Sequence, residues 1–292
     1  MSMAEAITEP RGRLVEIGDG RRLRAVPAGP EASERPLVVL EAGSFGFSAD
    51  WAAVQALLAD EGLRSLAYDR AGLGHSDPGP APRDSHAIVG DLEALLANLG
   101  EGGPYIVCGH SMAGLHTRLF ASRNAAQVRG LVLVDAVMPE AMDDPAAAHF
   151  VGHFNTLSKL AAWGASVGLQ RPLAGALGDA IGLPTPAKAE KQEAFAHAGH
   201  NRWAAAEVEA WHASAAQARA VEFDPDWPVA VVLTGDGHAP NSRQALQTAP
   251  ASASRQGAVF HIPGANHASM LGERHAGHIV RAVLATLTTA KA

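Results

Sequence analysis

The chain has 292 residues, 47% of them hydrophobic and 18% charged, which is typical of a globular protein with a sizeable core. Its 23 Lys and Arg against 30 Asp and Glu give a net charge of −7, which disfavours binding to nucleic acids. A single cysteine excludes an internal disulfide. No apolar run reaches the roughly 18–20 residues of a membrane span. Residues 1–26 lack the apolar stretch of a secretory signal, so we expect a cytoplasmic protein.

Short apolar strands alternate with helices in the first half of the chain. Residues 14–17 and 23–26 flank a Gly-Asp-Gly turn and predict a β-hairpin. Apolar periodicity then predicts strands at 37–40, 64–68, 105–108 and 130–134, and helices at 51–60, 84–99 and 112–122. Asp50 is a candidate N-cap of the helix at 51–60. This alternation predicts βαβ units, and therefore a mostly parallel central sheet flanked by helices.

The pattern changes between residues 139 and 224, which are rich in alanine and predict only helices. Strands return at 229–233 and 258–262, and a helix follows at 274–287. Because structureless loops of such length are uncommon, we expect 139–224 to form a helical lid over the strand ends. The predicted organisation is a core domain, 1–138 and 225–292, with a lid or cap inserted at 139–224. The lid's aromatic side chains are expected to form its core and to line part of a pocket.

Residues 109–114, Gly-His-Ser-Met-Ala-Gly, follow a predicted strand and open a predicted helix. A serine at such a turn is exposed above the strand ends, as a nucleophile must be. Small residues at Gly109 and Ala113 are required because larger side chains would collide across the turn. The backbone N–H of Met112 is left free at the start of the helix, where negative charge is favoured. Ser111 is therefore the candidate nucleophile.

Together with residues 40–44 (Leu-Glu-Ala-Gly-Ser) and 69–76 (Asp-Arg-Ala-Gly-Leu-Gly-His-Ser), this turn resembles motifs of the α/β-hydrolase superfamily. The resemblance covers about 12–138 and 225–290, and it implies the α/β-hydrolase fold with a lid inserted after strand 6. Residues 137–140 and 264–271 are similar to plant methylesterase and hydroxynitrile-lyase relatives. The resemblance also implies a serine hydrolase with a catalytic triad.

A serine nucleophile needs a base, and the base needs an acid that orients it. His267 follows the last predicted strand, where members of the superfamily present their base. Asp236 follows the strand at 229–233 and is the favoured acid. Asp135 follows the strand at 130–134 and is the alternative acid. Both acids are placed at carboxyl ends of parallel strands, where ligand sites form.

The oxyanion hole is expected to use the backbone N–H groups of Met112 and Ser44. Many members of the superfamily have His-Gly before this second donor, whereas this chain has Ala42-Gly43. Glu41 is unusual at this position: it is either buried and paired or turned to solvent, and burial would perturb its pKa.

The function predicted is an esterase that cleaves a small-to-medium carboxylic ester through an acyl-enzyme. Amide, thioester or C–C hydrolysis, lyase chemistry, and a cofactor-free oxidation are alternatives on the same fold. A ligand-binding protein on a hydrolase fold is an alternative of another class. No cofactor or metal is expected, because neither His149 with His153 nor His197 with His200 is accompanied by further ligands. The partners expected are a small-molecule ester and, in a homo-oligomer, a second copy of the chain.

Overall fold

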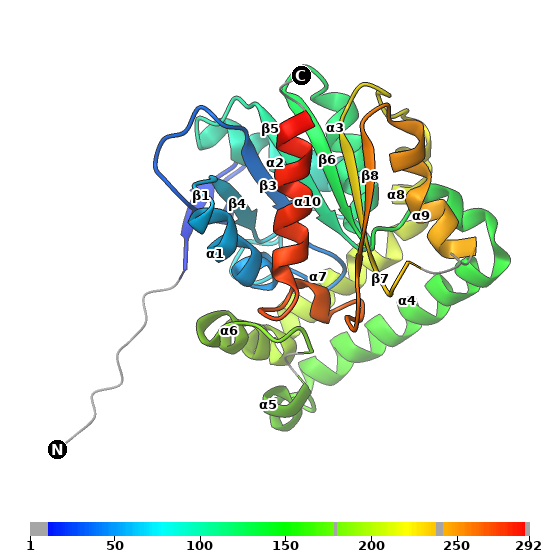
Figure 1. Cartoon of the computed structure of the whole chain (residues 1–292). Helices are drawn as coiled ribbons and strands as arrows, with labels where there is room; N and C mark the ends of the chain where they lie inside the picture. The colour runs from blue at the N-terminus through cyan, green and yellow to red at the C-terminus, as the bar shows by residue number, and fades with distance from the viewer. Residues whose placement is uncertain (1–10, 178–179, 238–241, 290–292) are drawn as a thin grey trace.

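The computed structural model describes residues 11–177, 180–237 and 242–289. Its strands form one sheet in the order β1-β2-β4-β3-β5-β6-β7-β8 (Figure 1). The strands are β1 (Arg13–Glu16), β2 (Arg22–Ala28), β3 (Leu37–Glu41), β4 (Ser65–Tyr68), β5 (Tyr105–His110), β6 (Val128–Val134), β7 (Val229–Thr234) and β8 (Gly257–Ile262). Strand β2 pairs antiparallel with β1 and β4, and all other pairs are parallel. The predicted mostly parallel sheet is confirmed.

Helices cover both faces of the sheet because its central strands are apolar on both sides. Val38 and Leu40 of β3 point to the face covered by α1 (Ala52–Asp60) and α10 (Ala276–Thr289). Leu37 and Val39 point to the opposite face, which is covered by α2 (Ser85–Asn98), α3 (Ala113–Arg123) and α9 (Ser242–Ala253). Figure 1 shows α10 running in front of the sheet. The 3-10 helices η1 (Ser48–Trp51) and η4 (Ser269–Leu271) lie in loops at the strand ends.

The segment between β6 and β7 contains helices and, among its described residues, no strand. Its elements are η2 (Pro139–Asp143), α4 (Pro145–Ser166), η3 (Arg171–Leu173), α5 (Ala174–Leu177), α6 (Thr185–Ala196), α7 (Ala198–Glu209) and α8 (Trp211–Arg219). Helix α4 packs along α7, and α8 packs on α2 and α3 of the core. Figure 1 shows α5 and α6 at the lower end of the molecule and α4 extending from there along one side. In the described chain no helix is both long and apolar enough to cross a membrane.

Aromatic residues of this segment do not all lie where the sequence predicts. Trp211 is buried and packs edge-on against Phe154. Phe150 and Trp163 on α4 are each 61% exposed, so neither belongs to a lid core. Asp50 is also placed differently: it lies inside η1, and Trp51 occupies the N-cap of α1.

Candidate active site

Ser111 lies on the turn between β5 and α3, at the carboxyl end of a central strand. Its backbone is left-handed, with φ 57°, which is strained for a residue other than glycine. A Cβ on Gly109 would lie 2.2 Å from Thr117 Oγ1, and one on Gly114 would lie 2.5 Å from the Val137 carbonyl oxygen. The turn therefore needs glycine at both positions, which keeps the helix close to the sheet beneath the half-buried serine.

Ser111, His267 and Asp135 form one chain of hydrogen bonds. Ser111 Oγ lies 3.0 Å from His267 Nε2, and His267 Nδ1 lies 2.5 Å from Asp135 Oδ2. An ionised carboxylate only accepts, so Nδ1 donates to it and Nε2 of the neutral ring can accept from the serine. Burial acts to raise the pKa of Asp135, but hydrogen bonds from His267 and Gln247 outweigh burial and lower it to about 2. The acid therefore stays ionised at neutral pH.

The structure does not pair His267 with Asp236, the acid that the sequence favours. Asp236 is exposed in the turn after β7, and the hydrogen bond to His267 comes from Asp135, the alternative acid. The sheet register gives the reason. Strands β5 and β6 are paired up to their last residues, so Ser111 and Asp135, which follow them, leave the sheet at the same level. Asp135 also has a left-handed backbone, with φ 40°, which turns the chain there.

The two predicted oxyanion donors belong to residues in contact, because Ser44 Oγ lies 3.4 Å from Met112 Sδ. Gly43 packs closely on Ser111: a Cβ added to Gly43 would lie only 2.9 Å from Ser111 Cβ. In the described parts of the chain, the backbone N–H groups of Ser44 and Met112 donate to no backbone carbonyl. They flank the serine and remain available to a negatively charged oxygen.

The Arg70 guanidinium orients the loop that carries the Ser44 donor. Its Nη1 donates to the Ala42 carbonyl at 2.5 Å and its Nη2 to the Gly43 carbonyl at 2.8 Å. The C=O and N–H of a trans peptide point in opposite directions. By holding the Gly43 oxygen, Arg70 therefore directs the Ser44 N–H away from itself.

Two carboxylates hold Arg70 in the interior. Glu41 lies 2.7 Å from Nη1, and Glu207 on lid helix α7 lies 2.8 Å from both Nε and Nη2. Burial lowers the pKa of Arg70, but the charges of Glu207 and Glu41 outweigh burial and raise it. Burial raises the pKa of Glu41 against the pull of Arg70 and of a hydrogen bond from Tyr68. Glu41 is therefore buried and paired, the first of the two outcomes that the sequence leaves open.

His110 lies between Gly109 and Ser111 in the chain, and its ring contacts His267. Its Nε2 lies 2.9 Å from the His267 carbonyl oxygen, and the two rings lie 4.6 Å apart. Burial, and secondarily the neighbouring His267, lower the pKa of His110 to about 3. A neutral ring can donate from Nε2 to that carbonyl, and this hydrogen bond fixes the main chain of the base.

A cavity of about 230 Å³ opens beside Ser111 and His267. Its apolar wall includes Ile181 and Phe195 of the lid segment and Leu271 of η4, whereas Asp50 and Lys191 contribute a charged wall. Of the lid aromatics, Phe195 thus lines this pocket, as the sequence predicts for some of them.

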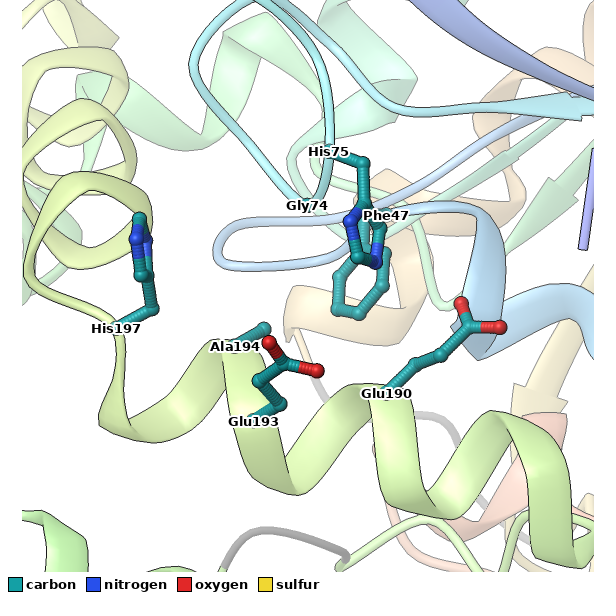
Figure 2. A pocket seen from close by; sticks show the side chains of 7 residues that line it. All are labelled: Phe47, Gly74, His75, Glu190, Glu193, Ala194 and His197. Carbon is teal, nitrogen blue, oxygen red and sulfur yellow. The ribbon is translucent and has the colours of Figure 1, made fainter. Parts of the chain in front are cut away.

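A smaller cavity, of about 90 Å³, lies between α6 and the loops that carry Phe47 and His75. Figure 2 shows Glu190 and Glu193 extending from α6 toward these loops. Neither Ser111 nor His267 lines it, so it is separate from the serine. Among the residues described, no three His, Cys, Asp or Glu side chains are grouped so that they could hold a metal ion.

Several residues that shape this site have no role predicted from the sequence. Arg70 belongs to the motif at 69–76. A charged residue directly after a predicted buried strand is a signal, present in the sequence, that the side chain has a role at the strand end. Gln247, which donates to Asp135 at 2.7 Å, lies on α9, a helix that contains Pro250 and is not predicted from the sequence. No local pattern marks it.

Comparisons with known proteins agree with the fold described above. The family model described as alpha/beta hydrolase fold matches residues 36–273. The chain therefore belongs to the α/β-hydrolase fold family, which supports hydrolase activity. Among curated proteins it is similar to the uncharacterised protein YqjL of Bacillus subtilis, with 35% identity over 101 residues. That match covers 35% of this chain and 40% of YqjL, so the chain spans less than half of that relative.

Solved structures show the same fold. An enol-lactonase from Burkholderia xenovorans is 21% identical, with a TM-score of 0.65 over 94% of this chain and 99% of that one. A thermophilic esterase from Thermogutta terrifontis is 20% identical, with a TM-score of 0.65 over 91% and 94%. An epoxide hydrolase mutant from Vigna radiata is 16% identical, with a TM-score of 0.70 over 94% and 99%. The TM-scores show a shared fold, and at such low sequence identity they carry no information on the substrate.

The hydrogen-bond chain predicts different effects for the two candidate acids. Asp135→Asn should lower kcat by roughly 10³–10⁴-fold, because an amide in that place no longer holds the tautomer that the base needs. Asp236→Asn, at an exposed position, should leave kcat near that of the unchanged protein. Steady-state kinetics on one ester measures both, and a larger loss in the Asp236 variant would overturn the assignment.

The buried ion cluster predicts a large loss of stability for Arg70→Met. Removing Arg70 leaves Glu41 and Glu207 buried without their cation, which should cost about 3–5 kcal/mol in the free energy of unfolding. The matched control is Arg22→Met, which breaks an exposed ion pair with Asp77 and should leave the free energy of unfolding nearly unchanged. Urea denaturation measures the difference, and equal losses in both variants would refute the role of burial.

Proposed function

We propose that the protein is a serine esterase that hydrolyses small carboxylic esters through an acyl-enzyme. The observation that carries the proposal is the hydrogen-bond chain from Ser111 through His267 to Asp135, next to two available backbone N–H groups. The similarity to an esterase and an enol-lactonase supports acyl transfer, because a lactone is a cyclic ester.

The residues divide the reaction between them. His267 Nε2 takes the proton of the Ser111 hydroxyl as Oγ attacks the ester carbonyl, and Asp135 stabilises the imidazolium that forms. The N–H groups of Ser44 and Met112 bind the oxyanion, a contribution of about 3–4 kcal/mol for one donor in other enzymes. His267 then gives its proton to the leaving alcohol. Water, activated by the same histidine, releases the acid and restores Ser111.

The Vigna radiata structure is that of an epoxide hydrolase. A serine as the nucleophile argues against epoxide hydrolysis by this protein. A serine that opened an epoxide would become an ether, and water does not cleave an ether under these conditions. An acyl-serine, in contrast, is an ester that the same base and oxyanion hole can hydrolyse. Turnover through Ser111 therefore favours acyl substrates.

Ester hydrolysis is tested with p-nitrophenyl acetate, butyrate and octanoate. We expect turnover of the short esters, and a lower kcat/KM for octanoate, since the cavity of about 230 Å³ is small for a long acyl chain. Ser111→Ala should lower kcat by at least about 10³-fold while the protein keeps its fold.

Activity that survives in the Ser111→Ala protein would contradict the proposal. If no ester is turned over but a fluorophosphonate labels Ser111, the same triad acts on an amide, a thioester or a C–C bond. If the probe does not label Ser111 either, a ligand-binding protein becomes the better account. The cytoplasmic location and the possible homo-oligomer stay predictions, which cell fractionation and light scattering would test.

A further inference from the structure

Lys191, on lid helix α6, reaches the loop that carries an oxyanion donor. Its Nζ donates to the Phe45 carbonyl at 3.0 Å. The same ammonium lies 2.8 Å from Asp50 Oδ1 and 3.0 Å from Oδ2, and 5.1 Å from the centre of the Phe47 ring. Both charged side chains are largely buried, at 18% and 7% exposure, so this ion pair is shielded from water.

The backbone that Lys191 holds is strained. Phe45 directly follows the Ser44 donor and has φ 58°, a left-handed conformation that an aromatic residue rarely adopts. Such strain persists only where surrounding contacts fix it. The Gly46 N–H donates to the Gly43 carbonyl at 3.0 Å within this turn, and Lys191 supplies the contact to the Phe45 oxygen from outside it.

The Ser44 N–H donor therefore lies between two backbone carbonyl groups, each of which accepts a hydrogen bond from a cationic side chain. Arg70 binds the Gly43 oxygen on one side of Ser44, and Lys191 binds the Phe45 oxygen on the other. Both contacts are linked to the lid, because Lys191 belongs to α6 and Arg70 is paired with Glu207 of α7 as well as with Glu41 of the core. Without these helices the Lys191 contact would be absent, and Arg70 would keep Glu41 as its carboxylate partner.

We propose that Lys191 is a positioning residue through which the lid holds the oxyanion loop, so that Ser111 is fully reactive only with the lid docked. This inference rests on the proposed serine chemistry and adds a means of regulating it. Lys191 contributes no proton to the reaction; it acts by fixing the direction of the Ser44 N–H.

Glu190, the residue before Lys191, provides a matched control. It also joins the lid to the core, through an ion pair with Arg24 at 2.6 Å, but it does not touch the oxyanion loop. Figure 2 shows its side chain on α6 beside the smaller cavity, and Glu190 does not line the cavity that contains Ser111. A general loosening of the lid should affect Glu190 and Lys191 variants alike, whereas the proposed positioning role should affect only Lys191.

The test compares Lys191→Met, Lys191→Arg and Glu190→Gln in the full chain. The readouts are kcat and KM for p-nitrophenyl butyrate, and the rate at which a small fluorophosphonate inactivates Ser111. Lys191→Met should lower kcat and the inactivation rate by roughly 10–100-fold, with a smaller change in KM, because oxyanion stabilisation acts in the transition state. Lys191→Arg should recover part of this loss, and Glu190→Gln should stay within about threefold of the unchanged protein.

Lys191→Met that is inactivated at the wild-type rate would overturn the inference and leave the proposed function intact. Equal losses in Lys191→Met and Glu190→Gln would also overturn it, in favour of general lid docking. A wild-type protein that the probe does not label would instead refute the proposed function. If Lys191→Met does not fold, Lys191→Gln, which keeps a donor without the charge, decides the question by the same inactivation rate.

Discussion

Three left-handed residues at the ends of adjacent strands set the geometry on which the site depends. Phe45, Ser111 and Asp135 follow β3, β5 and β6, and all have positive φ although none is glycine. Each such residue costs about 1–3 kcal/mol unless its surroundings favour it. In return, the chain turns sharply beyond each strand, which presents Ser111 to the cavity, directs Asp135 toward His267 and orients the Ser44 N–H. The strain thus lies where the chemistry requires exact directions.

The surroundings that hold these turns come from distant parts of the sequence. Arg70, from the loop after β4, binds two carbonyls of the β3 loop, and a carboxylate of the lid neutralises it. Gln247 on α9 donates to Asp135, and His110 anchors the main chain of His267. Each support joins one reacting element to another layer of the fold. The helices between β6 and β7 accordingly help to orient these residues, and they also form part of the cavity wall.

Much of the fold could be predicted from the sequence because periodicity and turn residues are local signals. The parallel sheet follows from apolar strands that alternate with helices, and Ser111 follows from a glycine-flanked turn between a strand and a helix. The choice between Asp236 and Asp135 could not be made in this way. It depends on the relative register of two strands and on a positive φ, neither of which composition reveals. The role of Lys191 could not be predicted either, because its partners Phe45 and Asp50 lie more than 140 residues away in the sequence.

The central claim is that Ser111 carries an acyl group during turnover. Peptide mass spectrometry of the protein, quenched with acid while it hydrolyses p-nitrophenyl butyrate, tests this most directly. The account predicts a butyryl group on the peptide that contains Ser111, and none on the corresponding peptide of the Ser111→Ala protein. Continued turnover with the acyl group on another residue, or with no acyl group at all, would contradict the account.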